Sequence, residues 1–127
     1  MSHLEHVFHV WNLVYDKTQD AKTVIKNFFH EDYRQCINGV IMNRDEFIDH
    51  ILEQKKNIDS LGFKCKVHLL ELNKLFILYD AKGKNIQGEA IEAEVIAYVE
   101  FKDDKIFKIH GQRYLMKGNP SEMDMGG

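Results

Sequence analysis

Apolar residues near the start of the chain recur every three or four positions, which is the period of a helix with one buried face. Between positions 3 and 17 they are Leu4, Val7, Phe8, Trp11, Val14 and Tyr15. A second segment of this kind covers positions 21–30, with Asp20 as its expected N-cap. A third begins after Asn43, where Glu46 three residues on is typical of a capping box, and reaches Leu61 before Gly62 ends it. The pattern therefore predicts three amphipathic helices.

A short hairpin is predicted between the second and third helices. Asn38-Gly39 separates two strand-like runs, Tyr33–Ile37 and Val40–Met42. Both turn residues tolerate the positive φ angles of a type I′ turn, so Asn-Gly between apolar runs is a strong signal for a hairpin.

From Phe63 onward the apolar period changes to 2, as expected for strands that bury one face. Four strands are predicted at positions 63–69, 75–80, 90–101 and 106–117, with turns or loops at 73–74, 81–88 and 102–105. Residues 118–127 are polar and rich in glycine, so we expect a flexible tail after one domain formed by residues 1–117. Helices followed by strands indicate an α+β protein.

The last two predicted strands suggest a register for their pairing. Phe101 opposite Phe107 sets Val99 against Ile109 and makes one face of the hairpin almost entirely apolar. A slip of one residue would set Lys108 against Val99, so the first register is favoured. The other face then mixes polar and apolar side chains: Glu94, Ile96, Tyr98, His110, Gln112 and Tyr114. This mixed face either lines a pocket or is the wet side of an antiparallel sheet.

The charge balance argues against some classes of partner. The chain has 127 residues, with 17 Lys and Arg against 20 Asp and Glu, which gives a formal net charge of −3. We expect no nucleic-acid partner, which would need a basic face, and no membrane span, which would need a long apolar run. Cys36 and Cys65 lack the spacing of a disulfide framework and are expected to be reduced thiols. Together with an N-terminus that does not resemble a signal peptide, they predict a cytoplasmic protein.

Three histidines repeat at every third position of the first predicted helix, at His3, His6 and His9. This spacing keeps the side chains near one another, so a metal site is geometrically conceivable. No acidic or Cys-rich segment offers further ligands. We therefore expect solvated histidines and no metal.

The order helix, helix, hairpin, helix and four strands resembles the NTF2-like superfamily, and within it the SnoaL-like branch. The segments that carry the resemblance are Phe28–Gly39 (FFHEDYRQCING), Met42–Ile51 (MNRDEFIDHI) and Val99–Ile109 (VEFKDDKIFKI). The similarity covers nearly the whole chain and specifies the fold better than the activity. It implies three helices packed on the concave face of a strongly curved mixed or antiparallel sheet, forming a cone. It also implies a deep cavity between the long helix and the sheet, and dimers through the outer face of the sheet.

In enzymes of this superfamily an acidic residue, often with a His or Tyr, performs acid–base chemistry in the cavity. The ketosteroid isomerases place an Asp base near the small hairpin, where this chain has Asn38. An Asn side chain takes up no proton at neutral pH, so the resemblance does not extend to that activity. The SnoaL-like cyclases use an acidic residue on the last strand, where this chain offers His110 and Gln112.

Glu94 and His110 are the candidate catalytic residues. An apolar cavity raises the pKa of a carboxyl group toward neutrality, which suits a general base or acid, and His110 could relay the proton. The expected pocket lining is Trp11, Tyr15, Tyr33, Asn38, Phe47, Ile51, Tyr98, Gln112 and Tyr114.

Two functional hypotheses follow. The first is a protein that binds a small apolar or carbonyl-bearing molecule, with acid–base catalysis of the isomerase, cyclase or dehydratase kind left open and no metal or organic cofactor expected. The alternative is a non-catalytic module for dimerisation or protein association. We expect a homodimer under both hypotheses, and the sequence names neither the ligand nor the dimer surface.

Overall fold

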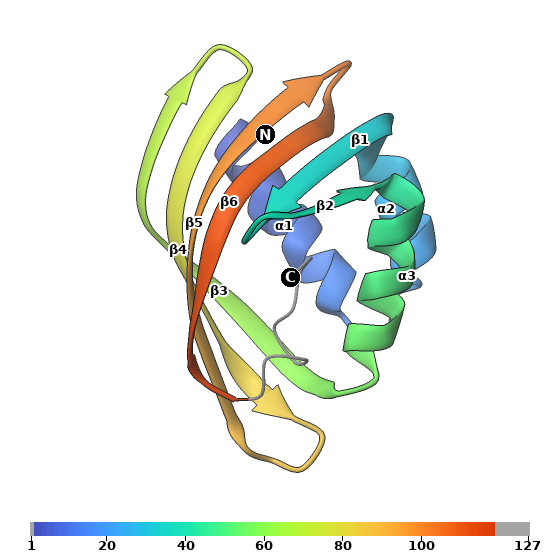
Figure 1. Cartoon of the computed structure of the whole chain (residues 1–127), viewed down its shortest axis with the longest axis vertical. Helices are drawn as coiled ribbons and strands as arrows, with labels where there is room; N and C mark the ends of the chain where they lie inside the picture. The colour runs from blue at the N-terminus through green and yellow to red at the C-terminus, as the bar shows by residue number, and fades with distance from the viewer. Residues whose placement is uncertain (1, 119–127) are drawn as a thin grey trace.

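One curved sheet wraps around a layer of helices in the computed structural model, which describes residues 2–118 (Figure 1). The helices are α1 (His3–Tyr15), α2 (Ala21–Phe28) and α3 (Arg44–Lys55). The strands are β1 (Phe29–Ile37), β2 (Val40–Asn43), β3 (Ile58–Glu71), β4 (Lys74–Asn85), β5 (Ala90–Lys102) and β6 (Lys105–Lys117). The helices cover the concave face of the sheet, so the predicted α+β architecture is confirmed. The predicted tail lies outside the described residues, except for Gly118.

The sheet is mixed, with the strand order β2-β1-β6-β5-β4-β3. Strands β3 to β6 pair with their sequence neighbours as an antiparallel meander, whereas β1 runs parallel to β6. The parallel pair brings the small hairpin, which precedes α3, beside the last strand of the chain. Residues 29–43 and residues 105–117, which are far apart in the sequence, therefore lie side by side in the sheet.

Local sequence signals account for several element boundaries. Asn43 caps α3 as predicted, since its side chain accepts a hydrogen bond from the Glu46 backbone N–H at 2.9 Å and the Glu46 carboxylate accepts from the Asn43 N–H at 3.0 Å. Asn38 and Gly39 have φ angles of 52° and 83°, as the predicted type I′ turn requires. The hairpin of β1 and β2 is therefore confirmed.

The third helix and the loop at 81–88 differ from the prediction. Helix α3 ends at Lys55, and Ile58, expected on the helix face, instead begins β3 and is buried there. Strand β4 continues to Asn85 because residues 82–84 pair with both β3 and β5. Gly83 was expected in a loop, but a side chain there would place its Cβ 1.8 Å from the Ser60 carbonyl oxygen. The close approach of two strands, rather than a turn, requires glycine at this position.

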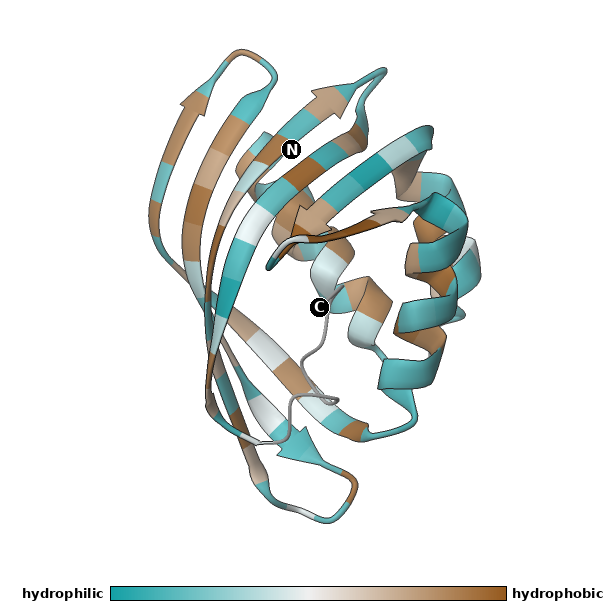
Figure 2. Ribbon diagram, viewed as in Figure 1, coloured by the Kyte–Doolittle hydropathy of each residue, from teal (hydrophilic) through white to brown (hydrophobic). Residues whose placement is uncertain are grey.

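The register of the last hairpin is the predicted one over most of its length. Val99 pairs with Ile109, but Phe101 pairs with Ile106 instead of Phe107, because a bulge interrupts the ladder after Glu100. The apolar side of this hairpin faces the helices, and apolar and polar residues alternate along the strands (Figure 2). The inward-facing residues of β4 and β5 form the floor of the core: Leu75, Ile77, Tyr79, Ala81, Ile91, Ala93, Val95, Ala97, Val99 and Phe101.

Candidate functional site

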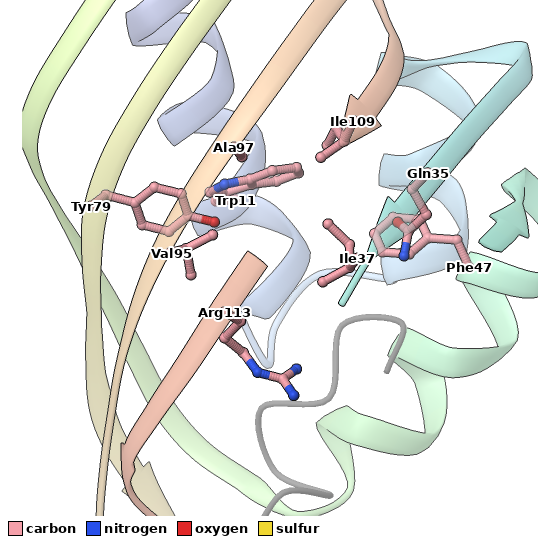
Figure 3. Close-up of a pocket in the computed structure, with 9 residues that line it drawn as sticks. All are labelled: Trp11, Gln35, Ile37, Phe47, Tyr79, Val95, Ala97, Ile109 and Arg113. Atoms are coloured by element: carbon pink, nitrogen blue, oxygen red, sulfur yellow. The ribbon is translucent and has the colours of Figure 1, made fainter. Parts of the chain in front are cut away.

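A cavity lies between helices α1 and α3 and the concave face of the sheet, where the resemblance places a ligand pocket (Figure 3). It is lined by Trp11, Gln35, Ile37, Phe47, Tyr79, Val95, Ala97, Ile109 and Arg113. The cavity volume that the centre of a water molecule can occupy is about 20 Å³. That is sufficient for one ordered water, whereas pockets for drug-sized ligands usually measure about 300–1,000 Å³.

Aromatic side chains fill the space that would otherwise form a deep pocket. The Phe29 ring lies 4.8 Å from Tyr33 and 5.3 Å from Phe47, measured between centroids, and it stacks on Trp11 at 5.9 Å. All four side chains are buried. Because helices α1 and α3 and strand β1 each contribute a large ring, the interior of the cone is packed as a core.

The polar side chains that line the cavity are Trp11, Gln35, Tyr79 and Arg113. Two further buried tyrosines bond to amide oxygens in the core. The Tyr33 hydroxyl donates to Gln35 Oε1 at 2.8 Å, and the Tyr15 hydroxyl donates to Gln54 Oε1 at 2.9 Å. Burial raises the pKa of the Tyr15, Tyr33 and Tyr79 hydroxyls above their ordinary value, so these groups stay protonated at neutral pH. The nine lining residues include no Asp, Glu or His. The lining therefore lacks the carboxyl and imidazole groups that most often transfer protons near pH 7.

The expectation that the mixed face of the last hairpin lines this cavity is wrong. Glu94 and His110 lie on the outer, convex face of the sheet, as do Tyr98, Gln112 and Tyr114. The pairing was predicted correctly, but the face was inverted: the apolar side of a sheet packs against covering helices, so the polar side turns to water. The Glu94 side chain is 42% exposed and forms an ion pair with Lys66.

The remaining expected pocket residues divide into three groups. Trp11 and Phe47 line the cavity. Tyr15, Tyr33 and Ile51 are buried in the core and are not among the lining residues. Asn38 is exposed in the hairpin turn and lies outside the core. It borders an open hollow of about 280 Å³ on the outer face together with Glu94, Gln112 and Tyr114, so four of the expected site residues do lie together, but not in the interior.

Asn38 instead fastens the hairpin turn to β6. Its side-chain Oδ1 accepts from the Arg113 backbone N–H at 2.8 Å, its Nδ2 donates to the Arg113 carbonyl at 3.3 Å, and its backbone N–H donates to the Gly111 carbonyl at 3.1 Å. These bonds extend the β1–β6 ladder past the end of β1. They hold the backbone of Arg113, whose side chain borders the cavity (Figure 3).

Seven lining residues were not expected: Gln35, Ile37, Tyr79, Val95, Ala97, Ile109 and Arg113. A signal for most of them is present in the alternation of the strands. Tyr79 follows Leu75 and Ile77 at intervals of two, and Val95 and Ala97 belong to the apolar side of the last hairpin.

The outer face of the sheet carries two adjacent rows that run across strands β3 to β6 and are apolar except at their ends on β6; we call them the apolar rows. The register defines the Phe76 row as Leu69, Phe76, Tyr98 and His110. It defines the Ile96 row as Val67, Leu78, Ile96 and Gln112. Exposed fractions reach 72% for Leu69, 56% for Val67, and 52% for both Phe76 and Ile96. A hollow of about 250 Å³ lies between the two rows.

A charged row borders the apolar rows on each side. The Lys74 row consists of Glu71, Lys74, Glu100 and Lys108, which are paired across the strands. The Asp80 row consists of Lys64, Asp80, Glu94 and Tyr114. Lys66, in the bulge of β3, forms ion pairs with both carboxylates of this row, and its Nζ lies 3.0 Å from Asp80 Oδ1. An apolar centre with a rim of both charge signs is typical of a protein–protein interface.

The N-terminal histidines contact aromatic rings. The His3 ring stacks on Phe101 with centroids 4.1 Å apart, and His6 meets Phe101 edge-on. Burial lowers the pKa of His6, and the neighbouring His3 and His9 lower it further. Within residues 2–118, no group of three or more His, Cys, Asp or Glu is arranged to hold a metal ion.

Two further properties concern the whole described chain. Cys36 and Cys65 are both free and half-buried. Among the helices that the structure describes, none is long and apolar enough to cross a membrane.

No family profile matches the chain. An uncharacterised protein of Schizosaccharomyces pombe is 26% identical over 102 residues, which cover 80% of this chain and 78% of that protein. Because this relative is itself uncharacterised, the similarity does not indicate a function for the chain.

Solved structures resemble the chain more extensively. A proposed isomerase from Rhodopseudomonas palustris superposes with a TM-score of 0.77 at 6% identity, covering 89% of this chain and 90% of the other. An NTF2-like protein of unknown function from Exiguobacterium sp. 255-15 gives 0.70 at 11% identity (87% and 96%). A proposed SnoaL-like polyketide cyclase from Jannaschia sp. CCS1 gives 0.68 at 10% identity (87% and 83%). At such low identity the likeness establishes the NTF2-like fold, shared with SnoaL-like proteins, and leaves the activity open.

Proposed function

We propose that this NTF2-like protein is a non-catalytic association module that forms a homodimer through the outer face of strands β3 to β6. The observation that carries the proposal is the contrast between the interior of the cone and the outer face of the sheet. The interior is filled by aromatic side chains, whereas the outer face leaves Val67, Leu69, Phe76 and Ile96 more than half exposed.

The interior offers little support for an enzyme or a ligand-binding protein. The cavity has room for about one water, and its lining lacks a carboxylate or imidazole. Glu94 and His110, the expected acid and base, lie on the other side of the sheet. A small apolar ligand of the kind bound by cavity proteins would have to displace Trp11 or Phe47, both of which are buried in contact with Phe29.

The outer face has the size of a specific interface. Four strands spaced about 4.8 Å apart and paired over about twelve residues of about 3.3 Å each cover roughly 750 Å². A stable protein complex of ordinary size buries about 800 Å² on each partner. Aligned packing of two such faces is a common arrangement of sheets.

The charges on this face favour a partner that resembles it. The charged residues of the face balance, so it has no strong field of one sign: Lys64, Lys66, Lys74 and Lys108 against Glu71, Asp80, Glu94 and Glu100. A nucleic acid or an acidic surface needs a basic face. A second copy of the chain brings the same mixture of charges and the same apolar rows.

Sedimentation analysis of matched lysine variants tests the proposal. Ile96 and Ile86 are 52% and 53% exposed, but Ile96 lies in the apolar rows and Ile86 lies in the turn between β4 and β5. We expect the wild type and Ile86→Lys to be dimers across the micromolar range. Ile96→Lys places two like charges in the interface and should weaken the dimer at least about tenfold, or about 1.4 kcal/mol.

Far-UV circular dichroism and a thermal melt confirm that both variants fold. A wild type that stays monomeric throughout this range contradicts the proposal, as does a dimer that Ile96→Lys and Ile86→Lys affect equally.

A further inference from the structure

We infer that Asn38 is a site of covalent modification by spontaneous deamidation, and that docking of its hairpin turn onto β6 protects it while the chain is folded. The reaction consumes only water, so it requires neither an enzyme nor a cofactor. The turn between β1 and β2 lies outside strands β3 to β6, so this site is independent of the proposed interface.

The residue after Asn38 leaves its side-chain amide open to attack. Asn38 precedes Gly39, and no other asparagine of the chain precedes a glycine. The Gly39 amide nitrogen can approach the Asn38 carbonyl carbon Cγ because Gly39 has no side chain to hinder it. A bond then forms between this nitrogen and Cγ, the bond from Cγ to Nδ2 breaks, and the amino group leaves as ammonia. Water opens the resulting cyclic imide at either carbonyl to give aspartate or isoaspartate.

Three hydrogen bonds of the folded chain oppose this attack. Both polar atoms of the Asn38 side chain bond to the Arg113 backbone, since Oδ1 accepts at 2.8 Å and Nδ2 donates at 3.3 Å. The Asn38 N–H donates to the Gly111 carbonyl at 3.1 Å. To meet the Gly39 nitrogen, the side chain must rotate away from Arg113 and break both of its bonds. The docked turn is therefore protected, although Asn38 itself is exposed to solvent.

The equilibrium between the docked and the open turn sets the degree of protection. A hydrogen bond of ordinary net strength shifts such an equilibrium by a factor of about 2 to 10. Three bonds that break together therefore hold the open turn at roughly a tenth to a thousandth of the molecules. Because the reaction proceeds from the open turn, the folded chain should deamidate more slowly than the unfolded chain by the same factor.

The products cannot restore the docked turn. A carboxylate at position 38 accepts hydrogen bonds but donates none, so it cannot replace the bond from Nδ2 to the Arg113 carbonyl. Isoaspartate also adds a carbon atom to the main chain, whereas the two-residue turn depends on the φ angles of 52° at Asn38 and 83° at Gly39. Modification is therefore a one-way record that the hairpin has opened.

Mass spectrometry on the full-length wild type provides the first test. The chain is incubated at neutral pH, folded in buffer and in parallel unfolded in guanidinium chloride, and peptides that contain Asn38 are analysed over time. Exchange of the amino group for a hydroxyl changes the peptide mass, and chromatography separates aspartate from isoaspartate. We expect conversion at Asn38 to be at least about tenfold slower in the folded chain.

Arg113→Pro tests the hydrogen bonds themselves. The Arg113 N–H and carbonyl both point toward Asn38, so Arg113 makes no backbone bond to Val95, its pairing partner on β5. Proline therefore removes the donor to Asn38 Oδ1 and places its ring there, without removing a bond to β5. Arg113→Ala is the matched control, because it loses the same side chain and keeps the N–H. We expect folded Arg113→Pro to deamidate at Asn38 at least about fivefold faster than folded Arg113→Ala.

Far-UV circular dichroism establishes that both variants fold. Two outcomes overturn the inference: a wild type that deamidates at Asn38 as fast when folded as when unfolded, or a folded Arg113→Pro that deamidates there no faster than Arg113→Ala. If Arg113→Pro does not fold, the comparison of folded and unfolded wild type still decides whether docking protects Asn38.

Discussion

Phe47→Ala should open the cavity at a large cost in stability. The Phe47 ring is 1% exposed, lies 5.3 Å from the Phe29 ring and 5.6 Å from the Tyr33 ring, and borders the existing cavity. Removal of a buried Phe side chain costs about 3–5 kcal/mol, and the cost is larger where neighbours cannot collapse into the space. The rings around Phe47 are held by different elements, so we expect about 4 kcal/mol, roughly a thousandfold in the folding equilibrium.

Urea unfolding at one fixed protein concentration measures this loss. Phe107→Ala is the matched control, because Phe107 is only half-buried beneath the Lys102 ammonium, 5.0 Å from the ring centroid, and should lose about 1 kcal/mol. The chain has a single tryptophan, which lines the same cavity, so its fluorescence reports on occupancy. Benzene should change the Trp11 emission of Phe47→Ala and leave that of the wild type unaltered. A loss below about 1 kcal/mol for Phe47→Ala, or a wild type that binds benzene equally well, would refute the account of a filled interior.

Two further predictions concern the frame of the sheet and the N-terminal helix. Gly83→Ala should lower the free energy of unfolding by about 2 kcal/mol or more in urea, because its Cβ would lie 1.8 Å from the Ser60 carbonyl oxygen. Gly62→Ala, whose nearest contact is 3.8 Å, should be neutral or stabilising, and equal effects of the two would contradict the close approach of β3 and β4 at Gly83. The pKa of His6 is lower in the folded chain than in the unfolded chain, so the unfolded chain takes up the His6 proton more readily. The free energy of unfolding should therefore have its full value above the unfolded pKa of about 6.5 and decrease as the pH falls through the lower folded pKa. His6→Gln should reduce the loss of stability between about pH 7.5 and about pH 5.5, whereas the exposed His68→Gln should not; a drop of unchanged size in His6→Gln would exclude His6 as its source.

The fold could be predicted because its local signals agree with one another. The Asn43 and Glu46 capping box, the Asn38-Gly39 turn and the change of period at Phe63 each specify one junction, and their order suffices for the cone. The end of α3 could not be predicted in this way. Ile58 fits the apolar face of a helix as well as the first buried position of a strand, and only its pairing with Asn85 decides between them.

The candidate site was misplaced for a different reason. The alternation of the last two strands specifies their register, but a period of two does not tell which face meets the helices. A pocket was expected on the mixed face, so Glu94 and His110 were assigned to it, although the apolar side with Val95 and Ala97 is the one that three helices must cover. The filling of the cavity depends on how Phe29 and Tyr33 pack against Phe47 of α3, and Phe29 against Trp11 of α1. No local pattern encodes such contacts between elements.

Sedimentation velocity on the wild-type chain, with Ile96→Lys and Ile86→Lys alongside, tests the central claim most directly. The account predicts a wild-type particle of twice the chain mass at micromolar concentration, the same particle for Ile86→Lys, and a shift to the mass of one chain for Ile96→Lys. A wild type that sediments as a single chain at every concentration would contradict the assignment of the outer face to self-association.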